Sequence, residues 1–306
     1  MTDAIGRRAF LAGAGAVVVL AACSGDGAAE DGDGTTPTTG RDGEAEAPPP
    51  RVLLLGEEYL LADALALGIT PVASTASVAD AGFIGIDHDT TGIEVLENAD
   101  TDLENLVALE TDVVVAAQYV VDALGREALE PYGEVTVVPD GLTVEEVVAL
   151  LADTFDRQAE ADELLGRLAA AKARAAEEIP PQEVSVAAIY PGPAVAVWVD
   201  GPWAVPQTLL DAGCTLVPGA DQPHDEDGRV HLSLENLDLV AGPTVLLMVS
   251  EVVEGEPAAI EQIQDDPLWS ELPGPAAGRV HQIDRLGYPG VEGHIRLIDD
   301  LIEILG

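Results

Sequence analysis

A long stretch of helical periodicity near the middle of the chain separates two parts that each alternate strands with helices. The periodicity runs nearly without break over residues 144–178 and ends before Pro180-Pro181, and Ala, Leu, Glu and Arg dominate residues 159–177. Thr143 caps its start, and Glu146 three residues later completes a capping box. A helix of 20 residues is about 30 Å long. We therefore expect a stiff linking segment at 144–179 between a lobe at 51–143 and a lobe at 180–306.

Short, continuous apolar runs lie on both sides of this segment, as strands buried on both faces of a sheet require. Before it, strands are expected at 52–55, 113–117 and 135–138, with helices at 57–67 and 121–129. After it, strands are expected at 184–189, 194–199, 245–249 and 280–283, with helices at 206–212, 234–240, 258–264 and 295–305. This order predicts an α/β fold of two halves joined by one long helix. A ligand would lie between the halves, near the carboxyl ends of the strands.

The first 23 residues predict export and a lipid anchor. Arg7 and Arg8 precede Ala9-Phe10-Leu11, a pattern typical of a twin-arginine signal. The apolar run at 12–20 is far shorter than the roughly 20 residues that cross a bilayer. Leu-Ala-Ala-Cys at 20–23 resembles a bacterial lipobox, in which Cys23 is acylated and becomes the new N-terminus. We expect an extracytoplasmic protein anchored to the cell membrane through Cys23; an ordinary signal peptide with an incidental cysteine is the alternative.

Residues 24–50 predict a disordered acidic linker. The segment consists mainly of Gly, Asp, Glu, Thr, Ala and Pro and has no large apolar residue. Such a segment cannot bury enough surface to offset the entropy of ordering it. We expect it to tether a folded body that starts near Arg51.

The charge balance excludes two classes of partner. The chain has 56 Asp and Glu against 13 Lys and Arg, which gives a net charge of −43, and Lys172 is its one lysine. Such a chain repels nucleic acid and anionic lipid headgroups. A strongly acidic surface with almost no lysine indicates adaptation to high salt, where screening relieves self-repulsion. An acidic composition without a salt requirement is the alternative.

The sequence offers no positive sign of catalysis, a metal centre or a resident cofactor. Asp87-His88-Asp89 and the histidines at 224, 231, 281 and 294 lack the spacing of a zinc site, so solvated or packed histidines are the simpler interpretation. No Gly-x-Ser-x-Gly, Gly-x-x-x-x-Gly-Lys or strand-linked Gly-x-Gly-x-x-Gly motif occurs. Since Cys23 would be acylated, Cys214 has no partner, and we expect it to be a buried small hydrophobic residue without a disulfide.

Four segments resemble one family in their order and spacing. They are Leu-Gly-Ile-Thr-Pro-Val at 67–72, Asp-Leu-Glu-Asn-Leu and the following residues at 102–115, Leu-Ser-Leu-Glu-Asn-Leu at 232–237, and Asp-Pro-Leu-Trp-Ser-Glu-Leu at 266–272 with Ala-Gly-Arg-Val-His at 277–281. Together they resemble the iron-siderophore and cobalamin class of ABC-transporter substrate-binding lipoproteins. Thr111 replaces the usual proline of the second segment, which leaves its register intact. The resemblance extends from the lipobox to Gly306.

The resemblance implies two Rossmann-like lobes bridged by a rigid helix, and no enzymatic activity. It implies a monomer that captures a small metal chelate, a ferric siderophore, and delivers it to an ABC permease. Cobalamin or haem is the alternative ligand, and the shortage of arginine counts in its favour. A non-transport sensory or adhesion module and a two-lobed extracytoplasmic enzyme are the alternatives from other classes.

Docking on the permease is implied for one glutamate in each lobe, at Glu104 and Glu235. Two well-separated carboxylates would define orientation as well as attraction. The alternative is that each is a solvated glutamate in the first turn of a helix, favoured by the helix dipole.

Ligand contacts are expected from aromatic side chains and a cation in loops next to the strand ends. Aromatic residues are scarce, with three Trp, five Tyr and three Phe, so their placement in loops is informative. Tyr119 and Tyr190 follow strands, although each could instead pack beneath a loop, and Trp269 belongs to a packing motif. The expected ligand-binding residues are Tyr119, Tyr190, Trp198, Trp203, Arg285 and Tyr288. Other candidate cations are Arg51, Arg126, Arg229, Arg279 and Arg296.

Overall fold

The computed structural model describes residues 48–98, 106–192, 194–201 and 203–306. Residues 48–306 form one compact unit, and everything below concerns this unit. The expected signal, Cys23 and nearly all of the expected linker lie outside the described residues, as does Glu104.

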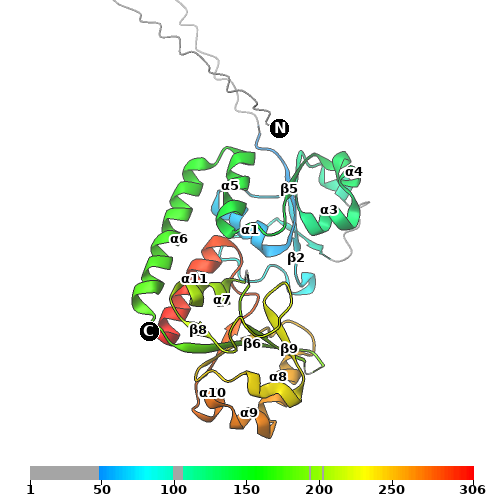
Figure 1. Ribbon diagram of the computed structural model, residues 1–306. Helices are drawn as coiled ribbons and strands as arrows, with labels where there is room; N and C mark the ends of the chain where they lie inside the picture. The colour runs from blue at the N-terminus through cyan, green and yellow to red at the C-terminus, as the bar shows by residue number, and fades with distance from the viewer. Residues whose placement is uncertain (1–47, 99–105, 193, 202) are drawn as a thin grey trace, which may run out of the picture. The chain divides into compact units, whose positions relative to one another are not determined.

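The N-terminal lobe is built on a sheet of five parallel strands in the order β3-β2-β1-β4-β5 (Figure 1). The strands are β1 (Val52–Leu55), β2 (Ala73–Ala76), β3 (Glu94–Glu97), β4 (Val113–Ala117) and β5 (Glu134–Val138). Leu53 pairs with Ala73 on one side and Val114 on the other, so β1 is the central strand. Its side chains alternate between two hydrophobic clusters, one on each face. The continuous apolar run of β1 is thereby explained.

Helices cover both faces of this sheet. They are α1 (Glu57–Ala66), α3 (Gln118–Leu124), α4 (Arg126–Leu129) and α5 (Val144–Phe155), with 3₁₀ turns η1 (Ala79–Ala81), η2 (Val107–Leu109) and η3 (Glu130–Tyr132). The single helix expected at 121–129 is wrong, because Gly125, at φ 85°, separates α3 from α4.

The expected long helix is also interrupted. The chain forms α5 and then α6 (Gln158–Glu178), with Asp156 between them in the left-handed conformation at φ 55°. Asp tolerates this conformation better than most residues. The Arg157 N–H then donates to the Ala152 carbonyl at 2.9 Å, which closes the end of α5. The expected capping box of Thr143 and Glu146 is confirmed at the start of α5, and α6 alone, 21 residues long, runs from one lobe to the other.

The C-terminal lobe contains a mixed sheet of six strands. Its path is β11-β10-β6-β7-β9, with β8 paired to β6. The strands are β6 (Glu183–Tyr190), β7 (Ala194–Trp198), β8 (Thr215–Leu216), β9 (Arg229–Leu232), β10 (Val245–Val249) and β11 (Val280–Asp284). The neighbours of β7 in the sheet, β6 and β9, both run antiparallel to it, whereas β6, β10 and β11 are parallel.

The helices of this lobe are α7 (Ala204–Asp211), η4 (Leu234–Leu239), α8 (Glu256–Gln264), α9 (Pro267–Glu271), α10 (Pro273–Ala276) and α11 (Gly290–Leu305). Trp269 of α9 is buried in a cluster with Leu247 and Ile263, which agrees with a packing role. Cys214 is a free, buried cysteine, as expected. The fold is two Rossmann-like lobes joined by one long helix, as the sequence predicted.

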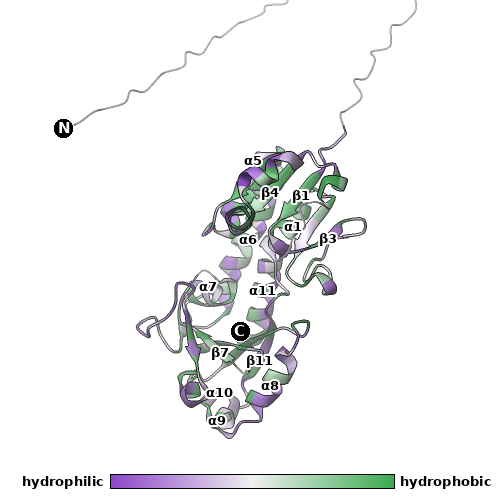
Figure 2. Cartoon of the chain, turned by 90° about the vertical axis from the view of Figure 1, so that its right-hand side faces the viewer, coloured by the Kyte–Doolittle hydropathy of each residue, from purple (hydrophilic) through white to green (hydrophobic). Residues whose placement is uncertain are grey.

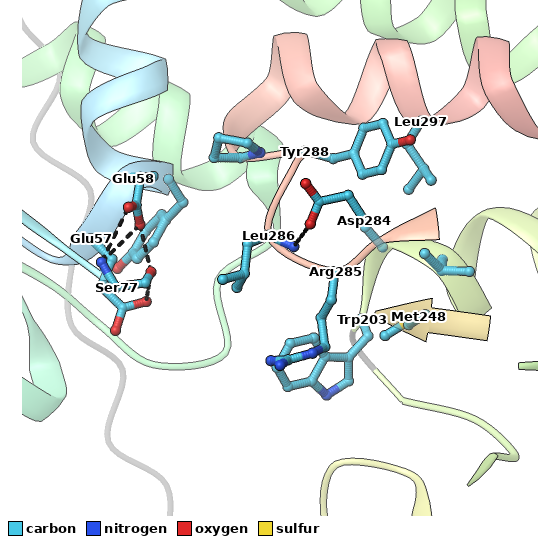
Figure 3. A pocket seen from close by; sticks show the side chains of 14 residues that line it. Glu57, Glu58, Ser77, Trp203, Met248, Asp284, Arg285, Leu286, Tyr288 and Leu297 are labelled. Atoms are coloured by element: carbon cyan, nitrogen blue, oxygen red, sulfur yellow. Dashed lines mark hydrogen bonds between the residues drawn. The ribbon is translucent and has the colours of Figure 1, made fainter. Parts of the chain in front are cut away.

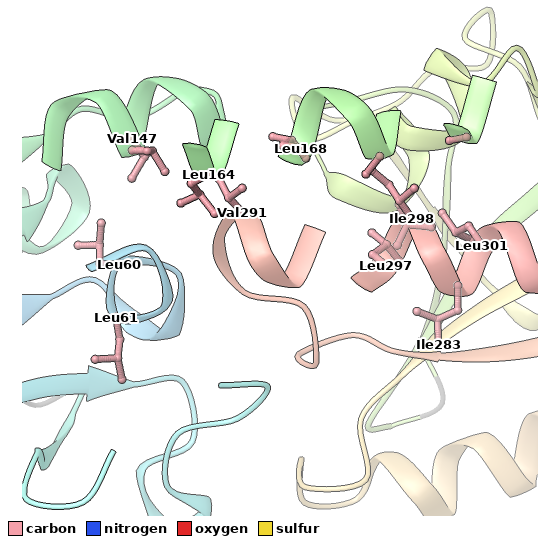
Figure 4. Close-up of a cluster of buried hydrophobic side chains, with 14 of the residues drawn as sticks. Leu60, Leu61, Val147, Leu164, Leu168, Ile283, Val291, Leu297, Ile298 and Leu301 are labelled. Atoms are coloured by element: carbon pink, nitrogen blue, oxygen red, sulfur yellow. The ribbon is translucent and has the colours of Figure 1, made fainter. Parts of the chain in front are cut away.

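One hydrophobic core crosses the boundary between the lobes (Figure 4). It joins Leu60 and Leu61 of α1 to Leu164 and Leu168 of α6 and to Ile298 of α11. The C-terminal helix α11 packs against α6 and also against α1 of the other lobe. Large relative motion of the lobes would expose this shared core to water, which opposes such motion.

The distribution of hydropathy matches this arrangement. Figure 2 shows hydrophobic strands inside each lobe and hydrophilic residues on the outer surfaces of the helices. None of the described helices is both long and apolar enough to cross a bilayer.

Candidate functional site

Two adjoining cavities lie where the lobes meet, and Tyr59, Trp203 and Ala204 line both of them. The first, of about 240 Å³, is lined from the N-terminal lobe by Glu57, Glu58 and Ser77, and from the C-terminal lobe by residues that include Asp284, Arg285 and Tyr288 (Figure 3). The second, of about 400 Å³, is lined by residues that include Asp63, Asp140, Leu142, Asp227 and Gly290. We call the two together the interlobe cleft. Its residues follow the carboxyl ends of β1, β2, β5 and β11, where ligands of open α/β sheets bind.

Two adjacent glutamates at the end of β1 form one wall. The Thr75 hydroxyl accepts hydrogen bonds from the backbone N–H groups of Gly56 and Glu57, at 2.9 and 3.0 Å, and thereby fixes the turn into α1. Ser77 donates from its hydroxyl to Glu58 at 2.5 Å and to Glu57 at 3.2 Å. Both carboxylates are therefore held next to each other at the cavity, as Figure 3 shows.

Burial shapes the titration of this wall and of Tyr119 beside it. It raises the pKa of Glu57, an effect that the Ser77 hydrogen bond opposes and the Glu58 charge reinforces. The pKa of Tyr59 is raised well above its usual range, mainly by burial. Burial, together with the charge of Glu57, raises the pKa of Tyr119 to about 12. Both phenols therefore stay neutral at physiological pH and can donate hydrogen bonds.

Trp203 forms the opposite wall, at the N-terminus of α7. Its side chain is 40% exposed, whereas Trp198 behind it is 1% exposed and meets it edge to face with ring centroids 6.3 Å apart. The Arg229 guanidinium lies 5.9 Å from the Trp203 ring centroid. Arg229 forms ion pairs with Asp225 and Asp227. Trp203 therefore offers an aromatic surface to the cleft, and the cation beside it is already neutralised.

Arg285 follows β11 and is the one arginine among the cleft-lining residues. Its guanidinium donates to Glu256 at 2.6 Å and lies 5.1 Å from the Tyr190 ring centroid. The side chain of Glu256 is fully buried, and its second oxygen accepts from the Ser250 backbone at 2.5 Å. The buried Nε of Arg285 has no hydrogen-bond partner within the part of the chain that the structure describes. The positive charge of Arg285 is compensated by Glu256.

Tyr288 and Asp284 complete this side. The Tyr288 hydroxyl donates to Asp300 at 2.5 Å, and burial with this carboxylate raises the Tyr288 pKa well above its usual range. Asp284 accepts from the Leu286 backbone at 3.0 Å, which shapes the loop that carries Arg285 and Tyr288.

Asp63 of α1 lines the second cavity from a buried position, with 1% of its surface exposed. Its Oδ1 accepts a hydrogen bond from the Val291 backbone at 2.8 Å, at the start of α11, whereas its Oδ2 has no hydrogen-bond partner among the described residues. Burial raises the pKa of Asp63 to about 7, and the Glu292 charge adds to this shift. This carboxyl therefore joins the two lobes and keeps one unused acceptor at the cleft.

The six residues expected to bind a ligand fall into three groups. Trp203, Arg285 and Tyr288 line the cleft. Tyr190 lies next to Arg285, and Trp198 is buried behind Trp203, so each supports a lining residue and is not itself a lining residue. Tyr119 lines neither cavity; it is 40% exposed and donates to Asn98 at 2.9 Å. The structure thus brings five of the six to the cleft region and leaves Tyr119 to one side.

Three of the other candidate cations are engaged away from the cleft lining, and Arg279 is exposed outside it. Arg51 donates to the carbonyls of Leu109 and Glu110. Arg126 donates to Val135, and Arg296 forms an ion pair with Asp87 at 2.7 Å.

The acidic residues that line the cleft were not predicted from the sequence. Glu57, Glu58 and Asp140 come directly after expected strands, and that position was the available signal. Asp63 gave no such signal, because it lies within a helix and only the packing of α11 against α1 brings it to the cleft.

The remaining predicted positions lie elsewhere. Glu235 is exposed on η4 and borders a separate surface pocket with Leu268 and Glu271. His88 contacts Glu292 at 2.7 Å and His294 contacts Thr208 at 2.9 Å, so these two histidines are packed or paired. Across the described residues, no three His, Cys, Asp or Glu side chains form a group that could hold a metal ion.

Comparisons with known proteins agree with this geometry. A family model described as periplasmic binding protein matches residues 62–285. No curated protein matches the chain.

Solved structures share the fold at low identity. Staphylococcus aureus SirA is 20% identical with a TM-score of 0.69, over 83% of this chain and 98% of its own. Bacillus subtilis FeuA, a triscatecholate siderophore binding protein complexed with ferri-bacillibactin, is 17% identical with a TM-score of 0.70, over 85% of this chain and 93% of its own. Vibrio cholerae FhuD, a siderophore binding protein bound to Fe³⁺–Desferal, is 22% identical with a TM-score of 0.68, over 84% of this chain and 98% of its own.

Proposed function

The chain belongs to the periplasmic binding protein family, and on that premise we propose that it captures a ferric siderophore in the interlobe cleft for delivery to an ABC permease. Proteins of this family bind solutes outside the cytoplasm and are not enzymes, which agrees with the sequence analysis. The family match also confirms the resemblance that the four sequence segments indicated.

The observation that carries the proposal is the interlobe cleft itself. It lies at the carboxyl ends of strands from both lobes, and its walls combine Trp203 and Tyr59 with polar side chains. Aromatic walls with a few polar groups suit a large, partly apolar chelate. The shared core beneath the cleft holds these walls in place before a ligand arrives, which lowers the cost of binding.

Tryptophan emission tests the ligand. Trp203 is exposed at the cleft, Trp198 lies against it, and Trp269 is buried in a different cluster. We expect saturable quenching when the purified chain is titrated with a ferric siderophore, and most of that signal should be lost in Trp203→Phe. Quenching by cobalamin or haem alone would assign the alternative ligand class. Quenching by none of these would favour a sensory or adhesion role.

Docking on the permease through Glu104 and Glu235 is part of the proposal. The exposure of Glu235 on η4 supports it, because a docking carboxylate must be accessible. We expect Glu104→Lys with Glu235→Lys to abolish uptake and to leave ligand affinity intact. Glu163→Lys, which reverses an exposed charge on α6, is the matched control. Uptake that survives the double charge reversal would reject the docking residues.

Membrane attachment through Cys23 and a monomeric state complete the proposal. The lipobox-like segment at 20–23 supports acylation of Cys23. We expect Cys23→Ser to move the protein from the membrane fraction to the extracellular or periplasmic fraction. An unchanged membrane fraction would reject the anchor, and a mass near that of two chains in light scattering would reject the monomer.

A further inference from the structure

The charge of the interlobe cleft restricts the chemistry of its ligand. Six carboxyl groups line the two cavities: Glu57, Glu58, Asp63, Asp140, Asp227 and Asp284. Asp227 is already paired with Arg229, and Asp63 is only partly ionised near pH 7, so Glu57, Glu58, Asp140 and Asp284 supply most of the negative charge. Arg285 is the one cation among the lining residues. In a partly enclosed site such charges act at a reduced effective dielectric constant, so they discriminate between ligands by sign.

Two arginines at the cleft, Arg285 and Arg229, do not offset this charge. Arg285 is paired with the fully buried Glu256, and Arg229 is paired with Asp225 and Asp227. Each ion pair removes the positive charge that an anionic ligand would need.

Asp63 supplies an observation independent of the charge count. It is buried at the second cavity, and its Oδ2 has no partner among the described residues. A buried acceptor without a donor is costly unless a ligand or water completes it. A ligand N–H that reaches this cavity would supply the missing donor.

The aromatic walls suit the same chemistry. Trp203 and Tyr59 line both cavities, so a positively charged group in either cavity lies near an aromatic side chain. Aromatic faces attract cations. Carboxylates and ring faces therefore favour the same sign of ligand charge.

On the premise of the proposed function, we infer that the cleft selects ferric hydroxamate chelates that carry a free ammonium group, and excludes anionic ferric chelates. Three hydroxamates contribute one negative charge each and neutralise Fe³⁺, so an ammonium tail makes the complex positive. Three catecholates contribute two negative charges each, so their complex with Fe³⁺ keeps three net negative charges. The ammonium tail reaches the second cavity, near Asp63 and Asp140, while the chelate core contacts Trp203.

Three ferric complexes test this inference by quenching of tryptophan emission in the purified chain at constant ionic strength. They are Fe³⁺–Desferal, which has a free ammonium group, the same complex with that amine acetylated, and ferri-bacillibactin, a triscatecholate. Acetylation removes the charge and leaves the chelate unchanged. We expect Fe³⁺–Desferal to bind about tenfold more tightly than its acetylated form, as one charge interaction in such a site implies. Ferri-bacillibactin should bind most weakly.

Variants test which side chains interact with the ammonium charge of the ligand. Glu57→Gln with Asp140→Asn should reduce the preference for Fe³⁺–Desferal over its acetylated form by about fivefold or more. Glu163→Gln, on the exposed surface of α6, should leave it unchanged. Added salt should shrink the preference, because screening acts on the partly exposed carboxylates.

The outcomes separate the inference from its premise. Binding of ferri-bacillibactin as tight as that of Fe³⁺–Desferal, or equal affinity for the acetylated and free forms, would overturn the inference and leave siderophore binding standing. Quenching by none of the three ferric complexes would overturn the proposed function itself.

Discussion

Neutralising Asp63 should stabilise the protein at alkaline pH. This carboxyl is buried between α1 and α11, and burial raises its pKa from an ordinary 3.8 to about 7. Because its pKa is higher in the folded state, the folded protein binds this proton more tightly than the unfolded chain does. The resulting stability is fully present below about pH 4 and is lost as the pH rises to about 7.

The size of the effect follows from the same pKa values. Each unit of pKa corresponds to about 1.4 kcal/mol, so the ionised Asp63 carboxylate destabilises the fold by up to about 4 kcal/mol at pH 8.5. Part of this destabilisation is already present at pH 5, so about 3 kcal/mol of it develops between pH 5 and pH 8.5. Asp63→Asn keeps an oxygen that can accept from the Val291 N–H and cannot ionise. Its advantage over the natural chain should therefore grow by about 3 kcal/mol over that range.

Urea unfolding at several pH values and one ionic strength measures this difference. The comparison of the variant with the natural chain at each pH cancels the titration of all other groups. Asp162→Asn, which neutralises an exposed residue of α6, is the control and should show a difference that barely changes with pH. A pH-independent gap between Asp63→Asn and the natural chain, or one that narrows as the pH rises, would refute the argument.

Two further perturbations test the contacts around the cleft. Gly290→Ala should lower the unfolding free energy by about 2 kcal/mol or more, because Gly290 has φ 64° and an added Cβ would lie 2.6 Å from Asp63 Oδ1. Thermal unfolding measures this loss, and a melting temperature equal to that of the natural chain would contradict it. Arg285→Leu should cost about 3–5 kcal/mol by leaving the buried Glu256 carboxylate unpaired. Adding Glu256→Gln should recover part of that loss in urea unfolding, and two losses that simply add would show that the pair is not coupled.

Much of the fold could be predicted because its strands are continuous apolar runs. Each expected strand is present within a residue or two of its expected bounds. The strands β8, which has only two residues, and β9, Arg-Val-His-Leu, were missed. The strands β2 and β3 were missed as well, since Ala-Ser-Thr-Ala at 73–76 and Glu-Val-Leu-Glu at 94–97 lack a run of large apolar residues. Their pairing with β1 and with each other supplies the order that their own composition does not.

Helix boundaries were less predictable because some depend on contacts distant in the sequence. The last helix begins at Gly290, five residues before its expected start at 295. Gly290 and Gly293 disfavour a helix locally. Glycine is nevertheless required at 293, because a Cβ there would lie 2.2 Å from the Tyr288 backbone. The break at Asp156 could not be predicted, because Asp is an ordinary residue on the outer face of a helix and gives no local signal of a helix end.

The site residues also divide into those that could be predicted from the sequence and those that depend on distant contacts. Trp203, Arg285 and Tyr288 could be placed at the cleft because they lie in loops beside expected strands. The pairing of Arg285 with Glu256 could not be foreseen, because it joins the end of β11 to the start of α8. That pairing changes the interpretation of Arg285 from a free cation for an anionic ligand to a compensated one.

Asp63 also connects stability with ligand choice. A fold that only needed a bridge between α1 and α11 would be served by Asn, which offers the same acceptor without the cost of a buried charge. If the carboxylate is kept for a ligand ammonium, Asp63→Asn should gain stability at pH 8 and lose affinity for Fe³⁺–Desferal by about tenfold, while its affinity for the acetylated complex stays near that of the natural chain. Stability by urea unfolding and affinity by tryptophan quenching, measured on one preparation, make the comparison. A variant that gains stability and still prefers Fe³⁺–Desferal over its acetylated form would show that Asp63 serves only the contact between α1 and α11.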